Sequence, residues 1–538
     1  MEKFDLVIKN GRIIDGTGNP WFYGDIGIRK DKIVQIGRIK DPKVIGKIID
    51  AEGLFVSPGF IDIHAHSEFT LLINGLAESK IRQGVTTEIV GNCGFSAAPV
   101  NKDGSIYYGA LEMKSVAEKI KPDWSDIKGY FKLLKSQGVS VNIGTLLGHN
   151  NIRVAVMGQD NRKPTSGEIG EMKKLVEKAV KDGVLGLSTG LSYGPGCFSE
   201  KDEVIELCKV FSGHGIYASH IRSLNDTIIE ASEEAIEIGE KAGMAIQISH
   251  YVPCYPYWHK ADGVINVLKN ARKRGIDVTC DFFPYIIGNV SLKSLCPPWA
   301  FEGGNKKLVE RLKIPEIREK IKEDTLKFGS RSGGSFKRAL IKDDHWDKIW
   351  LSHCNVNSDL VGMNFKEIAE KKETDPFNAL FDILIEESGV ASVVAEDRCE
   401  EDVEYFMKHP LSMIASDGYS LAPYGILGEG KQHPRSYGTF TRAICEYVKK
   451  KELINLEEVI KKMTLFPAKR FGIKKRGQLE EGFYADIVIY DYDELNDLAS
   501  MVNPHCYPEG IHYVIVNGKV TIEKNQHLNI KNGKILTK

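Results

Sequence analysis

Short apolar segments alternate with amphipathic segments through the middle of the chain. Eight segments rich in apolar and β-branched residues, each bounded by polar or turn-forming residues, indicate buried strands. They lie at 60–63, 86–90, 141–147, 184–187, 215–219, 245–249, 276–283 and 411–415. Apolar residues recur at helical spacing between several of them, as at 166–182, 225–242 and 263–274. Strands that alternate with helices form parallel sheets, so these units predict an α/β fold with a closed (β/α)8 TIM barrel over residues 59–475.

Both ends of the chain show the two-residue alternation of β-strands instead. The segments with this alternation are 4–15, 25–36, 484–490, 514–522 and 530–536. The first contains Asn10-Gly11, a dipeptide typical of tight hairpins. Because neither end is long enough to bury a core alone, we predict that residues 1–58 and 476–538 form one composite small β domain, a sandwich or barrel. Two unrelated terminal hairpins are the alternative, which the marginal stability of isolated hairpins disfavours.

One connection in the barrel is much longer than the others. The chain between Tyr285 and Leu411 separates the seventh and eighth predicted strands, and it contains a stretch rich in Gly, Ser and Lys at 328–337. Long connections in compact domains are usually functional lids or inserted units. We therefore predict a lid-like insertion at 287–350 over the barrel mouth, followed by helices at 364–369 and 378–388.

Potential metal ligands follow the predicted strands at corresponding places. In TIM barrels the active site lies at the carboxyl ends of the strands. The residues found there are His64 and His66 after the first strand, Cys93 after the second, His220 after the fifth, His250 after the sixth and Asp417 after the eighth. Each alone has a structural explanation, such as a buried cysteine, a core histidine or a helix cap. Together, imidazole, thiolate and carboxylate groups on five strands indicate a zinc site.

Composition excludes several other classes of protein. The formal net charge is −1, so no basic field would attract nucleic acid or anionic lipid. No segment approaches the roughly 20 apolar residues of a membrane span, and the amino terminus lacks the zones of a secretory signal. The ten cysteines contain no Cys-x-x-Cys pair. We expect a soluble cytoplasmic protein with reduced thiols and no nucleic-acid or membrane partner; its oligomeric state is open.

Longer motifs surround these candidate ligands. They are GFIDIHAHS at 59–67, GVTTEIVGNCG at 84–94, SDG at 416–418 and HPRSYGTF at 433–440. Through the His-x-His pair the chain resembles the amidohydrolase superfamily. Through the longer motifs it resembles, over nearly its whole length, the D-aminoacylase (N-acyl-D-amino-acid deacylase) family.

The resemblance implies a mechanism and a division of the metal ligands. It assigns a tightly held zinc ion to Cys93, His220 and His250, and a weaker second site to His64, His66 and Asp417. It implies hydrolysis of N-acyl-D-amino acids to a carboxylate and a free D-amino acid by metal-activated water, with Asp417 as general base and then acid. Related hydantoinases carry a carboxylated lysine on the fourth strand, whereas VLGLSTG at 184–190 has none.

The substrate of such an enzyme carries a carboxylate, which needs a cation or several hydrogen-bond donors. The candidates are Tyr193, Arg222, Tyr285, Ser291 and Arg435, although Arg222 and Arg435 could equally form structural ion pairs. The chain departs from the family where a lysine usually follows the strand-six histidine, because Tyr251 to Cys254 stand there. Either another group such as Lys260 replaces that lysine, or the substrate differs. The alternatives are a hydantoinase-like or dihydropyrimidinase-like activity on a cyclic amide, and a metal-binding barrel without catalysis.

Overall fold

Parallel strands close into a barrel at the centre of the computed structural model, which describes residues 3–40, 43–101, 104–105, 107, 113–211, 213–327, 335 and 337–538. The barrel strands are β6 (Phe60–Asp62), β7 (Val85–Val90), β8 (Asn142–Thr145) with β9 (Leu147–Gly148), β10 (Gly186–Gly190), β11 (Ile216–His220), β12 (Ala245–Ile248), β13 (Val278–Phe282) and β17 (Ser412–Ile414). Neighbouring strands pair in parallel, and a parallel bridge between Ala65 and Gly418 joins the last strand to the first. The predicted TIM barrel is confirmed.

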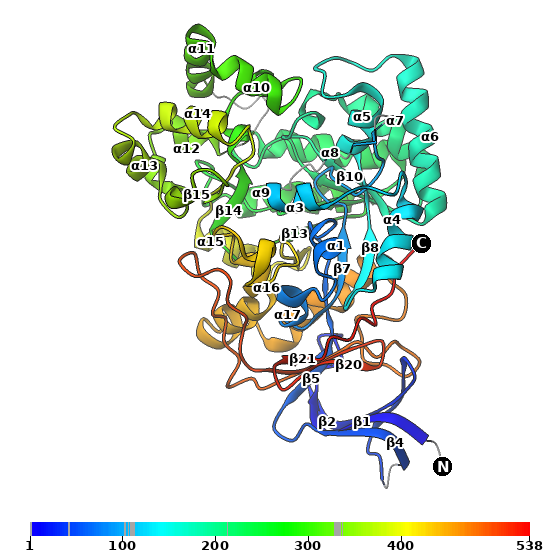
Figure 1. Ribbon diagram of the computed structural model, residues 1–538. Coiled ribbons are helices and arrows are strands. Elements are labelled where there is room, and N and C mark those ends of the chain that lie inside the picture. The colour runs from blue at the N-terminus through cyan, green and yellow to red at the C-terminus, as the bar shows by residue number, and fades with distance from the viewer. Residues whose placement is uncertain are drawn as a thin grey trace.

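Amphipathic helices surround the barrel, as Figure 1 shows. They are α4 (Ile127–Gln137), α5 (His149–Met157), α6 (Ser166–Asp182), α7 (Lys201–Cys208), α8 (Ile228–Ala242), α9 (Ala261–Lys273), α15 (Glu400–Lys408), α16 (Arg435–Ile444), α17 (Leu456–Met463) and α18 (Leu465–Arg470), with the short α1 (Thr70–Ile73), α2 (Glu78–Ile81) and α3 (Lys114–Lys119). In α6 the capping box of Thr165 and Glu168 satisfies the first turn, and left-handed Gly183 ends the helix. Its buried positions Met172 and Val176 are four residues apart and therefore share one face. None of the described helices is long and apolar enough to cross a membrane.

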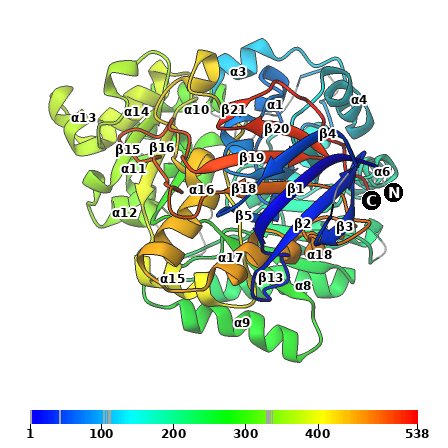
Figure 2. The ribbon, with the colours of Figure 1, turned by 90° about the horizontal axis from the view of Figure 1, so that it is seen from below.

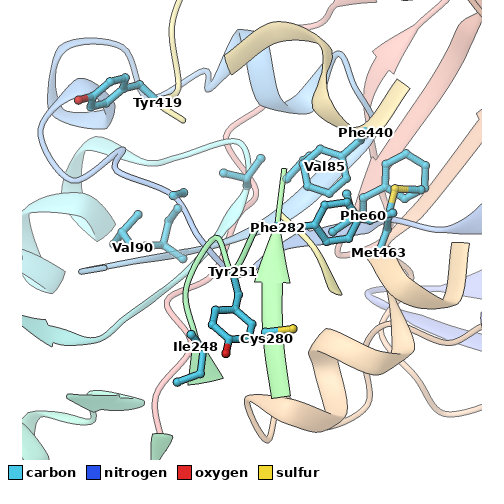
Figure 3. Packing of buried hydrophobic residues seen from close by; sticks show 14 of the residues in the cluster. Phe60, Val85, Val90, Ile248, Tyr251, Cys280, Phe282, Tyr419, Phe440 and Met463 are labelled. Carbon is cyan, nitrogen blue, oxygen red and sulfur yellow. The ribbon is translucent and has the colours of Figure 1, made fainter. Parts of the chain in front are cut away.

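Large side chains pack between the barrel strands and the surrounding helices (Figure 3). Phe60 from β6 stacks on Phe440 from α16 with ring centroids 5.8 Å apart, and Met463 lies beside them. Val85 of the neighbouring strand belongs to the same buried cluster. This packing fixes the first strand against the helices that follow the last one.

The two ends of the chain meet in one sheet, as predicted. Its strands are β1 (Lys3–Ile13), β2 (Phe22–Arg29), β3 (Lys32–Gly37), β4 (Lys43–Asp50), β5 (Phe55–Pro58), β18 (Ile487–Tyr490), β19 (Ile511–Val516), β20 (Lys519–Glu523) and β21 (Gln526–His527). Val56 of β5 pairs with Ile489 of β18, and both ends contribute to a common apolar core. Figure 2 shows the amino-terminal and carboxyl-terminal strands side by side.

The last segment with strand-like alternation, 530–536, does not form a hairpin. It runs along the barrel instead, where Ile143 N donates to Lys534 O at 2.9 Å and Leu536 N donates to Ile143 O at 2.7 Å. Its apolar residues are therefore explained by contact with the barrel, a partner that local sequence does not reveal.

The unit inserted after the seventh strand extends beyond the predicted 287–350. It contains the antiparallel strands β14 (Ile287–Ser291), β15 (Ile349–His353) and β16 (Ser392–Glu396), with α10 (Asn305–Leu312), α11 (Pro315–Leu326), α12 (Arg338–Lys342), α13 (Phe365–Lys371) and α14 (Pro376–Glu386). Because β16 returns to pair with β14, we define the inserted unit as residues 287–396, which have their own apolar core. The unit lies at the upper left of Figure 1. Most of the Gly/Ser/Lys-rich stretch, 328–334 and 336, lies outside the described residues.

The connection between β18 and β19 leaves the sheet and packs against α16. A Cβ atom at Gly438 would lie 2.2 Å from Asp497 Oδ1, so this close approach requires glycine. Asp497 Oδ1 accepts a hydrogen bond from Ala499 N at 3.2 Å. Burial raises the pKa of Asp497 to about 6, although the Arg442 guanidinium opposes the shift.

We expect Asp497→Asn to stabilise the protein in a pH-dependent way. With a folded-state pKa raised from 3.8 to about 6, the carboxyl group favours folding below pH 3.8, and this contribution is lost as the pH rises through 6. Asn cannot ionise, so the variant should exceed the wild type in free energy of unfolding by up to about 3 kcal/mol at pH 8 and by little near pH 4. Urea unfolding at both pH values measures this, with exposed Asp493→Asn as the control; an equal difference at both pH values would contradict it.

Candidate metal centre

The barrel brings the six predicted metal ligands together at its mouth. His64, His66, Cys93 and Asp417 form one group, and their potential ligand atoms lie within 4.8 Å of one another. A second, equally compact group consists of Cys93, His220 and His250. Cys93 belongs to both groups, and all six side chains are buried.

The second group has the donors and the spacing of a zinc site. Cys93 Sγ lies 3.8 Å from His220 Nδ1 and 3.6 Å from His250 Nε2. Tetrahedral zinc, with Zn–S near 2.3 Å and Zn–N near 2.0 Å, would separate sulfur and nitrogen ligands by about 3.5 Å. His220 Nδ1 and His250 Nε2 are closer together, at 2.6 Å. One sulfur and two imidazole nitrogens converging in a buried space therefore fit a zinc ion.

The first group adjoins the second through their shared residue, Cys93. Asp417 Oδ1 lies 3.0 Å from His66 Nε2 and 3.3 Å from His64 Nε2. His64 Nε2 also lies 3.2 Å from Cys93 Sγ. Two imidazoles and a carboxylate next to the thiol could hold a second ion that shares Cys93 with the first.

Three of these residues have a strained backbone. The φ angles of Cys93, His250 and Asp417 are 53°, 38° and 52°, in the left-handed region that residues other than glycine rarely adopt. Each follows the end of a barrel strand, where the chain must turn sharply while the side chain stays at the mouth. Such conformations cost about 1–3 kcal/mol each and are concentrated at functional sites.

Asp281, on β13, orients two of the histidines. Its Oδ1 atom accepts a hydrogen bond from His250 N at 2.8 Å and lies 3.1 Å from His64 Nδ1, while Oδ2 accepts from Gln247 Nε2 at 2.9 Å. A bond to Nδ1 leaves Nε2 of His64 free to bind a metal. Asp281 was not among the predicted site residues, although its place near the end of the seventh strand was a signal like that of the predicted ligands.

Charges around the site control its protonation. Burial raises the pKa of Asp417, but the Arg435 guanidinium and His64 outweigh this and hold it well below its ordinary value. Arg435 Nη1 donates to Asp417 Oδ2 at 2.6 Å. Burial and the neighbouring His220 hold the pKa of His250 well below its usual range, which favours the neutral imidazole that binds metals.

A pocket opens above these ligands between the barrel and the inserted unit. Its described lining residues are His66, Cys93, Phe95, Tyr107, Gln159, Tyr193, Gly194, Asn289, Val290, Ser291, Lys293, Ser294, Phe301, Asn305, Asp417, Tyr419 and Arg435. The barrel therefore supplies the potential metal ligands, and the inserted unit supplies much of the opposite wall. Lys293, Asn289 and Gln159 were not among the predicted site residues.

The predicted substrate-binding residues divide into two sets. Tyr193, Ser291 and Arg435 line the pocket. Arg222 is not in that lining, because its guanidinium pairs with Glu234 at 2.9 Å and donates to backbone carbonyl groups. Tyr285 lines a separate groove, where the Arg442 guanidinium lies 4.8 Å from its ring.

Lys260, the suggested replacement for the missing lysine, precedes α9 and is exposed, outside the pocket lining. The described lining thus offers a different lysine, Lys293, on the inserted unit.

Comparison with known sequences places these residues in a family. A model described as the amidohydrolase family matches residues 47–219 and 402–522. The chain is 31% identical to an N-acyl-D-glutamate deacylase of Alcaligenes xylosoxydans xylosoxydans over 96% of its own length and 93% of that protein. It is 30% identical to a D-aminoacylase of the same organism, over 100% of this chain and 98% of the other.

Solved structures agree with the sequence comparison. A crystal structure of D-aminoacylase matches 99% of this chain and 100% of its own with a TM-score of 0.83 and 28% identity. The N-acyl-D-glutamate deacylase of Bordetella bronchiseptica, complexed with zinc and a phosphonate mimic of the tetrahedral intermediate, matches all of both chains with a TM-score of 0.82 and 29% identity. An L-hydantoinase of Arthrobacter aurescens, at 16% identity and a TM-score of 0.56, shares the fold. The chain therefore belongs to the amidohydrolase family, in the group that contains D-aminoacylase and the N-acyl-D-amino-acid deacylases.

Proposed function

We propose that this protein hydrolyses the amide bond of N-acyl-D-amino acids to a carboxylate and a free D-amino acid, with zinc as its cofactor. The observation that carries the proposal is the convergence of Cys93, His220 and His250 beside Asp417 at the base of a pocket. The relatives named as deacylases, and the relative solved with zinc and a phosphonate, support the reaction and the metal. The preference for D-amino acids is supported by these relatives.

The types of ligand atom suggest which residues would bind each metal ion. Cys93, His220 and His250 would hold one zinc ion tightly, because thiolate and neutral imidazole are preferred zinc ligands. His64, His66 and Asp417 would form the weaker second site. Bound zinc lowers the pKa of a water ligand from 15.7 to about 7 and polarises an amide carbonyl.

Asp417 is the proposed general base and acid. It is ionised because Arg435 donates to Oδ2, which leaves Oδ1 directed at His64 and His66. In this position Asp417 would accept a proton from the attacking water and deliver it to the amide nitrogen. Protonation of that nitrogen is needed because an unprotonated amine leaves poorly.

The pocket would hold the rest of the substrate. Tyr193, Ser291 and Arg435 are retained as substrate-contacting residues because they line the pocket, and its Phe95 and Phe301 side chains favour an apolar group. Arg222 and Tyr285 are not retained. We also propose a reducing, cytoplasmic setting, since all ten cysteines are free thiols.

Hydrolysis of a cyclic amide is the second candidate. The observation that favours it is the absence of a lysine at the usual place after His250, where Tyr251 to Cys254 stand. Strand β10, with the sequence GLSTG, has no lysine that could bridge two metals after carboxylation, which argues against this candidate. The third alternative, a barrel without catalysis, does not explain why an ionised Asp417, paired with Arg435, lies beside the potential metal ligands.

The proposal is tested by turnover. We expect the zinc-loaded protein to release free amino acid from N-acetyl-D-amino acids and not from the L-enantiomers. Asp417→Asn should lower kcat by at least about 100-fold, because general acid–base catalysis contributes factors of this size. Turnover of hydantoins or dihydrouracil instead would favour the cyclic-amide alternative.

Asp281→Asn tests how the metal ligands are oriented. The Asn amide group cannot accept all the hydrogen bonds that the carboxylate accepts from Gln247, His250 and His64, so the ligands should lose their fixed orientation. We expect zinc affinity to fall by about 10- to 100-fold, measured by competition with a chelator. The matched control is Asp277→Asn, an exposed residue immediately before the same strand; an equal loss in both variants would argue against the orienting role.

A further inference from the structure

Two lysine or arginine side chains line the pocket in the part of the chain that the structure describes, Arg435 and Lys293. Asp417 balances the charge of Arg435, at a distance of 2.6 Å. Lys293 Nζ donates to the neutral Oδ1 atom of Asn305 at 2.9 Å, and no described carboxylate pairs with it. The described pocket therefore contains one lysine without a counter-charge.

Lys293 is presented by a packed segment of the inserted unit. It lies on the short helix η3 (Leu292–Leu295), which directly follows β14. Leu292 and Leu295 are buried in the core of the inserted unit, and Asn305 is the first residue of α10. The backbone that carries the ammonium group is thus fixed on both sides, which suits a residue that positions a ligand.

Two polar groups near Lys293 in sequence lack partners in the same pocket. Ser291 Oγ and Asn289 Oδ1 are buried atoms without a hydrogen-bond partner, and both residues line the pocket. Buried polar atoms in folded proteins are nearly always paired, so a ligand is a natural partner. The Ser291 hydroxyl can donate, and the Asn289 amide can turn its NH2 group toward a ligand, because its oxygen and nitrogen occupy equivalent positions.

A carboxylate satisfies all three groups at once. It accepts hydrogen bonds through two oxygens, and bonds from a charged donor are about twice as strong as neutral ones. It would also supply the missing counter-charge in a pocket where water is partly excluded and electrostatic attraction is strengthened. A phosphate fits less well, because the site offers a single cation. A neutral amide also fits less well, because one amide oxygen needs fewer donors than the site offers.

We propose that Lys293, with Ser291 and Asn289, binds a carboxylate of the substrate amino acid. It would act as the cation that this chain lacks after His250. The inference rests on the proposed function, because every N-acyl amino acid carries an α-carboxylate and an acidic side chain supplies a second one. Lys293 is thus a specificity-determining residue contributed by the inserted unit.

The experiment compares substrates with and without the carboxylate. If the bound group is the α-carboxylate, Lys293→Met should lower kcat/KM for N-acetyl-D-methionine at least about tenfold, mostly through KM, which is the size expected for loss of a charge-assisted hydrogen bond. The same variant should leave turnover of N-acetyl-D-methionine amide within about twofold of the wild type. Lys293→Arg, which keeps the charge, should recover much of the loss. Lys306→Met, on an exposed position of α10, is the matched control and should change neither substrate.

A second substrate pair identifies which carboxylate is bound. Equal losses in Lys293→Met for N-acetyl-D-methionine, N-acetyl-D-glutamine and N-acetyl-D-glutamate assign the α-carboxylate. A loss confined to N-acetyl-D-glutamate assigns the side-chain carboxylate. Either result supports the proposal; equal losses on the methionine derivative and its amide, or no loss on any substrate, overturn it.

The inference can fail separately from the proposed function. If the wild type hydrolyses none of these compounds, the proposed function fails, and Lys293 is then tested by binding. Calorimetric titration of N-acetyl-D-methionine, N-acetyl-D-glutamate and N-acetyl-D-methionine amide into zinc-loaded wild type and Lys293→Met should show that at least one acid binds more tightly than the amide, and only when Lys293 is present. Equal affinities of both acids for the two proteins, or no binding of either acid, overturn the inference. A thermal unfolding midpoint close to that of the wild type excludes misfolding of the variant as the cause.

Discussion

Closure of the barrel between its last and first strands is the constraint on which the candidate site depends. Asp417 N donates to His64 O at 2.8 Å, and His66 N donates to Gly418 O at 2.9 Å. These two backbone bonds set the distance between the Asp417 carboxylate and both imidazoles. Nearby, Asp62 of β6 accepts a hydrogen bond from the buried Lys80 ammonium at 2.7 Å, so a charged pair also stabilises the junction between the first and last strands. Removing one partner of such a buried pair is strongly destabilising, so substitutions at this junction should destabilise the protein.

Local sequence was sufficient to predict the barrel and the potential metal ligands that follow its strands, because alternation of strands and helices determines where the carboxyl ends of the strands meet. It was insufficient wherever a partner distant in sequence decides the outcome. The extent of the inserted unit depends on pairing between Val290 and Val393, which no local pattern encodes. Arg222 was a plausible carboxylate ligand until Glu234 on α8 was seen to neutralise it. Lys293 could not be predicted either, because nothing in its own segment of sequence indicates that it lines a pocket.

The proposed chemistry and the proposed selectivity belong to different parts of the chain. The potential metal ligands lie at or just beyond the carboxyl ends of barrel strands, where the sheet anchors the backbone. The opposite wall of the pocket comes from the inserted unit, which has a separate apolar core. Substitutions in that wall can change which molecules fit without disturbing the ligands, a separation that suits a scaffold used for many related reactions.

The pairing of β5 with β18 has a consequence for how the protein is made. During synthesis the amino-terminal strands emerge first, but the edge of β5 that β18 later covers stays open until most of the chain has followed. At about 5–20 residues per second that interval lasts tens of seconds. An open edge flanked by apolar strands is a template for pairing with other chains. Until β18 is made, that edge has no partner from the carboxyl-terminal half of the sheet, and a chain truncated before residue 487 would leave it permanently unpaired.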